Sequence, residues 1–175
     1  MFENRQNARA GGIARLMPNL AVSIGKSPNP LIARGLGTAQ RDAVSDLAAR
    51  LGTTEWMMDE TQFDRITTLT GCGPGFLYRF IAALAEGAAA LGIEADLAER
   101  LAKQMVAGAA MLAAESPLPP DRLARQVASP GGMTQAGFDV LDEDEALRGL
   151  MVRCLAAAAD RGRDLARDAT GTPPP

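Results

Sequence analysis

The sequence predicts an all-α fold, a helical bundle arranged around one long buried helix, and composition is the first reason. Of the 175 residues, 47% are hydrophobic but only 4% are aromatic. The core must therefore be built mainly from Ala, Leu, Met, Val and Ile. An alanine-rich composition with few aromatic residues favours tightly packed helices over strands. The length predicts one domain that is large enough to bury a core.

The second reason is a continuous apolar stretch at residues 76–91, in which Arg79 and Glu86 are the only charged side chains. A helix that is apolar nearly all round must be buried on most of its surface. We expect this stretch to form the central helix, and we expect a partner subunit to cover part of it. The segment G-C-G-P-G at residues 71–75 is predicted to be a break before that helix, because proline is favoured at the first helical position.

The other helices are predicted from apolar periodicity and from the residues that start and stop helices. They cover residues 38–51, 59–69, 94–115, 121–128, 134–141 and 142–168. Three proline-rich or glycine-rich interruptions separate them. No internal repeat is visible along the chain.

The N-terminal segment is predicted to be short and irregular or extended. Residues 13–17 and 54–58 are short strand candidates, and residues 25–37, which hold two prolines and several glycines, are expected to be loop or irregular chain. The predicted organisation has three regions. They are a lead-in and remnant linker at 1–37, a helical dimerisation domain at 38–169 and a disordered tail at 170–175.

Composition excludes several classes of function. The chain has no histidine, so it can form neither a Ser/His/Asp triad nor a metal site that contains histidine, and no metal is expected. The net charge of −3 argues against a nucleic-acid partner, which usually needs a basic face. The most apolar stretch is shorter than the roughly 20 residues of a membrane span, so no membrane partner is expected.

Cysteine usage and the N-terminus indicate the compartment. Cys72 and Cys154 form no C-x-x-C pair and are too few for a disulfide framework. Residues 1–10 are polar and basic, without the apolar run of a secretory signal. We therefore expect a cytoplasmic protein.

The segment most informative about function is residues 129–138, S-P-G-G-M-T-Q-A-G-F. The proline stops the preceding helix, and Gly131 and Gly132 let the backbone turn sharply. A new helix begins at Met133, and its free amides at the positive end of the dipole make a site for a small anion such as a carboxylate. Thr134 adds a hydroxyl there. The alternative is an ordinary corner between two helices, which this segment alone does not exclude.

Three segments in order resemble one enzyme family. They are R-L-M-P-N at residues 15–19, F-D-R-I-T-T-L-T-G-C-G-P-G-F at 63–76 and S-P-G-G-M-T-Q-A-G at 129–137. Their order and spacing are similar to those of the C-terminal part of pyrroline-5-carboxylate reductase. The resemblance covers residues from about 15 to about 165.

The resemblance implies a fold and a reaction. Members of that family have an N-terminal Rossmann domain that holds NAD(P)H and a C-terminal helical domain that interlocks with its copy in a homodimer. The cofactor's hydride reduces 1-pyrroline-5-carboxylate, an imino acid, to proline. By this likeness the substrate would be held by Ser129, Gly131, Gly132, Met133 and Thr134, with Thr134 as the catalytic residue. Asn19, Cys72 and Gly73 would lie on the cofactor side.

The sequence also departs from the family pattern. Sixteen residues precede Met17, too few for a β-α-β dinucleotide-binding domain, and no G-x-G-x-x-G follows a predicted strand. Gly35-Leu36-Gly37 comes after the position where that domain should end. Leu20-Ala21 stand where the family usually has Thr-Pro, and Cys72 where it often has serine.

Three explanations remain open for the missing cofactor motif. The chain is the C-terminal piece of a longer reductase, or it works with a separately encoded Rossmann subunit. Alternatively, it is a catalytically inactive paralogue that serves as a helical dimerisation or small-ligand-binding module. In each case we expect a homodimer.

Overall fold

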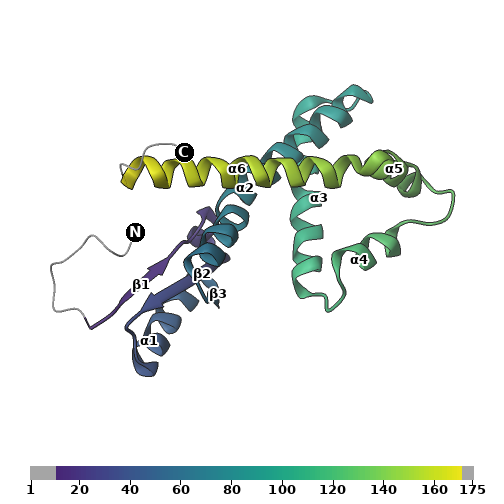
Figure 1. Ribbon diagram of the computed structural model, residues 1–175. Coiled ribbons are helices and arrows are strands. Elements are labelled where there is room, and N and C mark those ends of the chain that lie inside the picture. Colours follow the sequence, from purple (N-terminus) through teal and green to yellow (C-terminus); the bar gives the residue numbers. More distant parts are fainter. Residues whose placement is uncertain (1–10, 171–175) are drawn as a thin grey trace. The chain divides into compact units, whose positions relative to one another are not determined.

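The computed structural model describes residues 11–170, and this part of the chain is mostly helical, as the composition predicts (Figure 1). The helices are α1 (Thr38–Ala49), α2 (Glu60–Ala90), α3 (Ala95–Glu115), α4 (Pro120–Val127), α5 (Met133–Asp142) and α6 (Ala146–Thr170). The strands are β1 (Ile13–Leu16), β2 (Ser27–Arg34) and β3 (Gly52–Trp56). Short 3₁₀ helices are η1 (Leu20–Ile24) and η2 (Glu143–Glu145). Residues 1–10, and all but the first residue of the predicted tail, lie outside the described part.

The three strands form one sheet in the order β1-β2-β3. β1 runs antiparallel to β2, with Arg15 opposite Ile32, and β3 runs parallel to β2, with Trp56 opposite Leu31. Because α1 connects the two parallel strands, β2, α1 and β3 form a β-α-β unit. A small α/β element therefore accompanies the helices, where the sequence predicted only short extended pieces.

The prediction of loop or irregular chain at residues 25–37 is wrong for most of that segment, because it contains β2, the best buried of the strands. Its prolines caused the error. Met57 N–H donates to Leu31 O at 2.7 Å, so the odd-numbered residues of β2 hydrogen-bond towards β3. Pro28 and Pro30 then turn their nitrogens towards the β1 side. There the ladder of β1 ends at Leu16, opposite Leu31, and the last bond, from Met17 N–H, goes to the carbonyl of Pro30. The missing proline donors therefore interrupt neither ladder.

The predicted helix break at residues 71–75 is also wrong, because α2 continues through it as one helix of 31 residues with Pro74 inside. A proline removes the amide that would bond the carbonyl four residues earlier, which here is Thr70 O. That carbonyl instead accepts from Asn19 Nδ2 at 2.8 Å. Asn19, in the segment after β1, thus supplies the hydrogen bond that the missing amide of Pro74 would have made. The helix can therefore continue past Pro74.

The chain divides into two compact units. The first contains the sheet, α1 and α2 up to Pro74, together with the described residues from Ala157 on. The second runs from Gly75 to Ala156, so α2 and α6 each contribute to both units. The three predicted regions, 1–37, 38–169 and 170–175, stay a prediction.

The core of the first unit packs on both faces of the sheet. Ile32, Met57 and Phe63 form a buried cluster on one face. Leu31 points to the opposite face, because neighbouring strand residues alternate, and it is fully buried there, as is Ala48 of α1. The sheet is thus held between an α2 face and an α1 face, and Phe63 is the aromatic side chain that fixes α2 on it.

We predict that Phe63→Ala lowers the free energy of unfolding by roughly 3–5 kcal/mol, because it removes a buried ring and leaves a cavity. Urea denaturation at a fixed protein concentration measures this. Leu47→Ala on α1 is the matched control, since Leu47 is 63% exposed, and its cost should stay within about 0.5 kcal/mol. Equal costs for the two variants would contradict the placement of this core.

Candidate functional site

The segment predicted to bind an anion forms the corner between α4 and α5, within the second unit. Gly131 has a φ of 70°, in the left-handed region that favours glycine. Gly132 N–H donates to Ser129 O at 2.9 Å and closes the turn, and the Gly132 carbonyl accepts the first bond of the helix. The amides of Met133 and Thr134 have no acceptor within the helix, as at every helix start. Gly132 has no side chain that could cap them.

This corner is exposed, and its turn depends on glycine. Ser129 and Thr134 are exposed, and Met133 is 94% exposed. A Cβ at Gly132 would lie 2.4 Å from Ser129 Oγ, which is too close, and 3.0 Å from Ser129 O, which is a tight contact. The fold thus brings Ser129, Gly131, Gly132, Met133 and Thr134 together at one helix start, where unpaired amides and the helix dipole favour an anion.

Asn19, predicted on the cofactor side, has its side chain fully engaged in the first unit. Its Oδ1 accepts from Ala21 N–H at 2.8 Å, which caps η1. Its Nδ2 donates to Thr70 O, the carbonyl that Pro74 leaves without a helical donor. Its backbone N–H donates to Ser27 Oγ at 2.9 Å. Asn19 therefore acts on the fold, and its contact with a cofactor stays a prediction. Pro74, four residues after Thr70, was the sequence signal for this bond.

Cys72 and Gly73, the other residues predicted on the cofactor side, lie in the interior of α2. Cys72 is exposed and Gly73 is half-buried. Neither stands at the start of a helix, so their amides are not available to an anion in the way that those of the corner are. Both belong to the first unit, whereas the corner residues belong to the second.

The turn Gly35-Leu36-Gly37 is the described feature nearest to a dinucleotide-binding loop, since it leads from β2 into α1. Gly35 has a φ of 69°. However, Gly37 N–H donates to Gln40 Oε1 at 2.9 Å, so the chain itself occupies the start of this helix. Gln40 also stands where the third glycine of the motif would be. This turn therefore does not fit a pyrophosphate.

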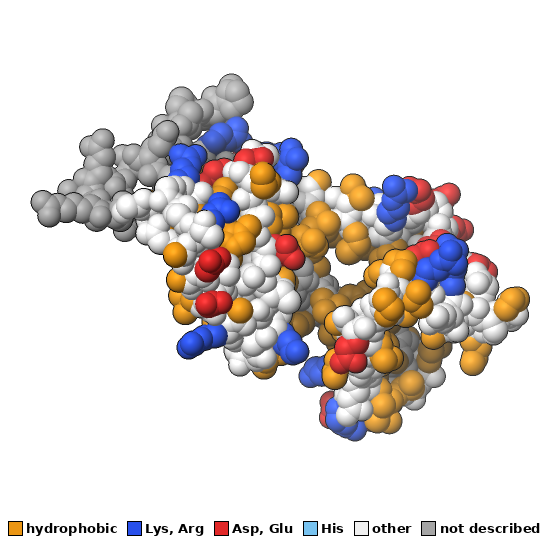
Figure 2. Space-filling view, turned by 90° about the horizontal axis from the view of Figure 1, so that it is seen from below, with side chains coloured by type: hydrophobic (Ala, Val, Ile, Leu, Met, Phe, Trp, Pro, Cys, Tyr) orange, Lys and Arg blue, Asp and Glu red, His pale blue; other side chains and the backbone are white. Residues whose placement is uncertain are grey.

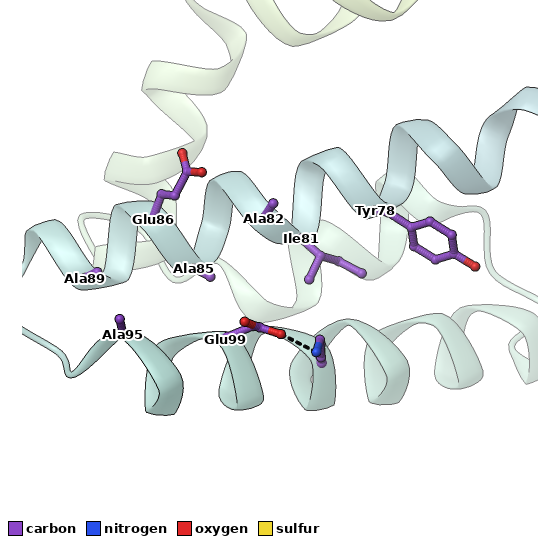
Figure 3. Close-up of a pocket in the computed structure, with 9 residues that line it drawn as sticks. Tyr78, Ile81, Ala82, Ala85, Glu86, Ala89, Ala95 and Glu99 are labelled. Atoms are coloured by element: carbon purple, nitrogen blue, oxygen red, sulfur yellow. Dashed lines mark hydrogen bonds and ion pairs between the residues drawn. The ribbon is translucent and has the colours of Figure 1, made fainter.

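A groove of about 700 Å³ lies between the second half of α2 and α3, and sequence reasoning missed it (Figure 3). Alanines make up much of its wall, and Lys103 lies at it in an ion pair with Glu99 that holds the pKa of Glu99 below its ordinary value. The alanine run after residue 81 was the available signal. Its lining residues are Tyr78, Ile81, Ala82, Ala85, Glu86, Ala89, Ala95, Glu99 and Lys103.

Large apolar side chains near this groove remain exposed in the single chain, and Figure 2 shows many hydrophobic side chains at the surface of one face. On α2, Phe63 alone is buried, whereas Leu77, Tyr78 and Phe80 are 42%, 56% and 42% exposed. The described chain does not itself provide the burial that the sequence predicts for the central helix. Apolar surface of this extent marks a protein interface.

Two further properties concern the described residues as a whole. Within residues 11–170, the Cys, Asp and Glu side chains form no cluster of three that could hold a metal ion. In the same range, no helix is both long and apolar enough to cross a membrane.

A helical domain whose central helix leaves large apolar side chains exposed is typical of proteins that associate through such a surface. Residues 60–165 match the family model described as pyrroline-5-carboxylate reductase dimerisation. The chain therefore belongs to the pyrroline-5-carboxylate reductase family, as the three ordered segments predicted.

Relatives with curated functions agree with this assignment. The chain is 39% identical over 152 residues to the pyrroline-5-carboxylate reductase of Pisum sativum, an alignment that covers 86% of this chain and 55% of that protein. It is 33% identical over 154 residues to the Aquifex aeolicus reductase, which covers 87% of this chain and 57% of that protein. The chain thus spans about half the length of the curated relatives it matches, in their C-terminal part.

Solved structures show the same fold. A pyrroline-5-carboxylate reductase from Coxiella burnetii superposes with a TM-score of 0.84 at 34% identity, covering 90% of this chain and 58% of that one. A pyrroline carboxylate reductase from Plasmodium falciparum, solved with NADP bound, has a TM-score of 0.77 at 24% identity. It covers 87% of this chain and 61% of that one.

We predict an energetic coupling between Asn19 and Pro74. Asn19→Ala should lower the free energy of unfolding by about 1–3 kcal/mol, because Thr70 O loses the donor that Asn19 Nδ2 supplies. In a Pro74→Ala background the helix regains its own amide at position 74, so the same change should cost about 1 kcal/mol less. The capping bond to Ala21 is lost in both backgrounds and cancels from the cycle.

Denaturant unfolding of the four proteins at one protein concentration completes this double-mutant cycle. Additive effects, with no coupling beyond about 0.3 kcal/mol, would show that Asn19 does not replace the missing helical donor.

Proposed function

We propose that this chain forms the homodimeric, substrate-binding part of a pyrroline-5-carboxylate reductase, with the α4–α5 corner as the site of the imino acid. The α5 start carries the proposal, because its first amides lack a side-chain cap and Thr134 lies in the same turn, next to a corner that favours glycine at positions 131 and 132. The ordered match to the family's dimerisation domain supports it.

The proposed homodimer would bury the large apolar side chains of α2 that are exposed in a single chain. The groove between α2 and α3 and the apolar side chains beside it leave a surface that a second copy of the same domain would cover. Burial of apolar area contributes roughly 25 cal/mol per Å², so covering several such side chains would stabilise the pair substantially. The family model, which describes a dimerisation domain, supports this assembly.

At the corner, we assign the carboxylate of the imino acid to the amides of α5 and the Ser129–Gly132 turn. A carboxylate there would complete the bonds that the helix leaves open and would lie at the positive end of the dipole. The Thr134 hydroxyl is placed to donate to the substrate from the first turn, and it is the proposed catalytic residue. Hydrogen bonds to a charged group contribute roughly 1.5–3 kcal/mol each.

The proposed function also needs a binding site for the cofactor. In a reductase of this kind NAD(P)H supplies the hydride. The described residues do not by themselves supply a pyrophosphate-binding turn, because Gln40 occupies the Gly35–Gly37 turn. Contacts of Asn19, Cys72 and Gly73 with the cofactor stay a prediction. We therefore assign to this chain dimerisation and substrate binding, and we assign cofactor binding to a further domain, on the same polypeptide or on another.

The alternative is an inactive paralogue that acts as a dimerisation or small-ligand-binding module. Sedimentation tests what the two hypotheses share, and calorimetry with an imino-acid analogue separates them. Both require a dimer, so a stable monomer contradicts both. Binding of a carboxylate at the corner supports the reductase assignment, and a dimer that binds no imino-acid analogue supports a purely structural module.

We predict that Thr134→Val weakens binding of L-proline, the product-like carboxylate, about tenfold or more, because one hydrogen bond to a charged group is lost. Titration calorimetry on the dimer measures the dissociation constant. Thr38→Val is the matched control, because Thr38 is an exposed threonine in the first turn of α1, where Gln40 already serves as the cap. Equal loss of affinity in both variants would argue against the corner as the site.

A further inference from the structure

Met133 is the most exposed of the large apolar side chains that the structure describes, at 94%. The proposed function uses its backbone amide and leaves its sulfur without a role. The two residues before it, Gly131 and Gly132, have no side chains that could shield it. Met57, by contrast, is 7% exposed. Because an oxidant reaches an exposed thioether most easily, Met133 is a site where a peroxide would act early.

The position of Met133 in its helix gives such an oxidation a consequence. Met133 is the first residue of α5, and Gly132 supplies no side-chain cap for the amides that follow it. A thioether sulfur is only a weak hydrogen-bond acceptor, so the reduced side chain does not occupy these amides. The helix start therefore stays open to a carboxylate as long as Met133 is reduced.

Methionine sulfoxide carries an oxygen on Sδ, the same number of bonds from the backbone as Oε1 of glutamine. Two glutamines of this chain use that oxygen at a helix start. Gln40 Oε1 accepts from Gly37 N–H at 2.9 Å before α1, and Gln62 Oε1 accepts from Met58 N–H at 2.8 Å before α2. A side-chain oxygen of this reach thus serves as an acceptor for backbone amides at a helix start, and a sulfoxide at position 133 would supply one to α5.

We infer that Met133 is an oxidation site through which a peroxide regulates ligand binding at the α4–α5 corner, an inference that rests on the proposed function. Hydrogen peroxide transfers one oxygen atom to Sδ. The thioether is oxidised, the O–O bond breaks, the S–O bond forms and water leaves. The sulfoxide oxygen then competes with the substrate carboxylate for the α5 amides. A methionine sulfoxide reductase reverses the step with a dithiol, which becomes a disulfide while the oxygen leaves as water.

The test measures L-proline binding by titration calorimetry before and after treatment with hydrogen peroxide, with peptide mass spectrometry to locate each added oxygen. We expect Met133 and Met58 to be oxidised before Met57, and the dissociation constant of L-proline to rise at least about fivefold. Dithiothreitol reduces oxidised forms of Cys72 such as a sulfenic acid, and it should leave the dissociation constant high. Methionine sulfoxide reductase should restore it.

Three variants assign the effect to one sulfur, each compared with itself before and after peroxide. Met133→Leu has no thioether at the corner, so peroxide should leave its dissociation constant unchanged, whatever the starting value. Met58→Leu is the matched control, because Met58 is 88% exposed and lies in the other unit, and its dissociation constant should rise as in the natural chain. Met133→Gln carries the oxygen permanently and should bind L-proline at least about fivefold more weakly than Met133→Leu.

Three results would overturn the inference. They are a Met133 that stays unmodified while Met58 is oxidised, an unchanged dissociation constant in a chain whose Met133 is oxidised, and an equal rise in Met133→Leu and the natural chain. The proposed function fails by a different result. If the reduced natural chain binds no L-proline, the corner assignment is refuted and the inference with it, whereas L-proline binding that peroxide does not weaken refutes the inference alone.

Discussion

The bond from Asn19 Nδ2 to Thr70 O compensates the carbonyl that Pro74 leaves without a helical donor, and the continuous course of α2 follows from it. Pro74 removes one amide from the ladder of α2, and an uncompensated carbonyl in the helix would favour a break there. Asn19 supplies the missing donor while its Oδ1 caps η1 and its backbone N–H bonds Ser27. One side chain thus fixes the link between β1 and β2 to the helix, and α2 can continue as a single element.

Because α2 is continuous, its second half belongs to the second unit and supplies part of the apolar surface of that unit. Its second half carries the small side chains that line the groove beside α3, and its larger apolar side chains remain exposed in one chain. Burial that the chain does not supply for itself is the physical reason for association. The α4–α5 corner is exposed too, which the proposed ligand site requires. Its two glycines have different reasons: Gly131 has a positive φ, and a Cβ at Gly132 would meet Ser129 Oγ.

Much of the helical architecture could be predicted, because helix signals are local. The starts and ends of α3, α4 and α5 fall within one residue of the predicted bounds, where prolines and glycines mark them. The same residues misled the prediction elsewhere. Pro28 and Pro30 indicated a loop, and Pro74 indicated a helix start. Whether a proline breaks an element depends on which neighbour its nitrogen faces, and sequence alone does not contain that information.

By itself, the sequence determined the family, the helical class and the corner at residues 129–134, since each depends on motifs or on bonds between near neighbours along the chain. Only the tertiary structure decided that residues 27–34 form a buried strand, that α2 passes through Pro74, and that Asn19 supports the helix. Those outcomes depend on partners distant in sequence, 51 residues apart for Asn19 and Thr70, and such contacts exist only once the chain has folded.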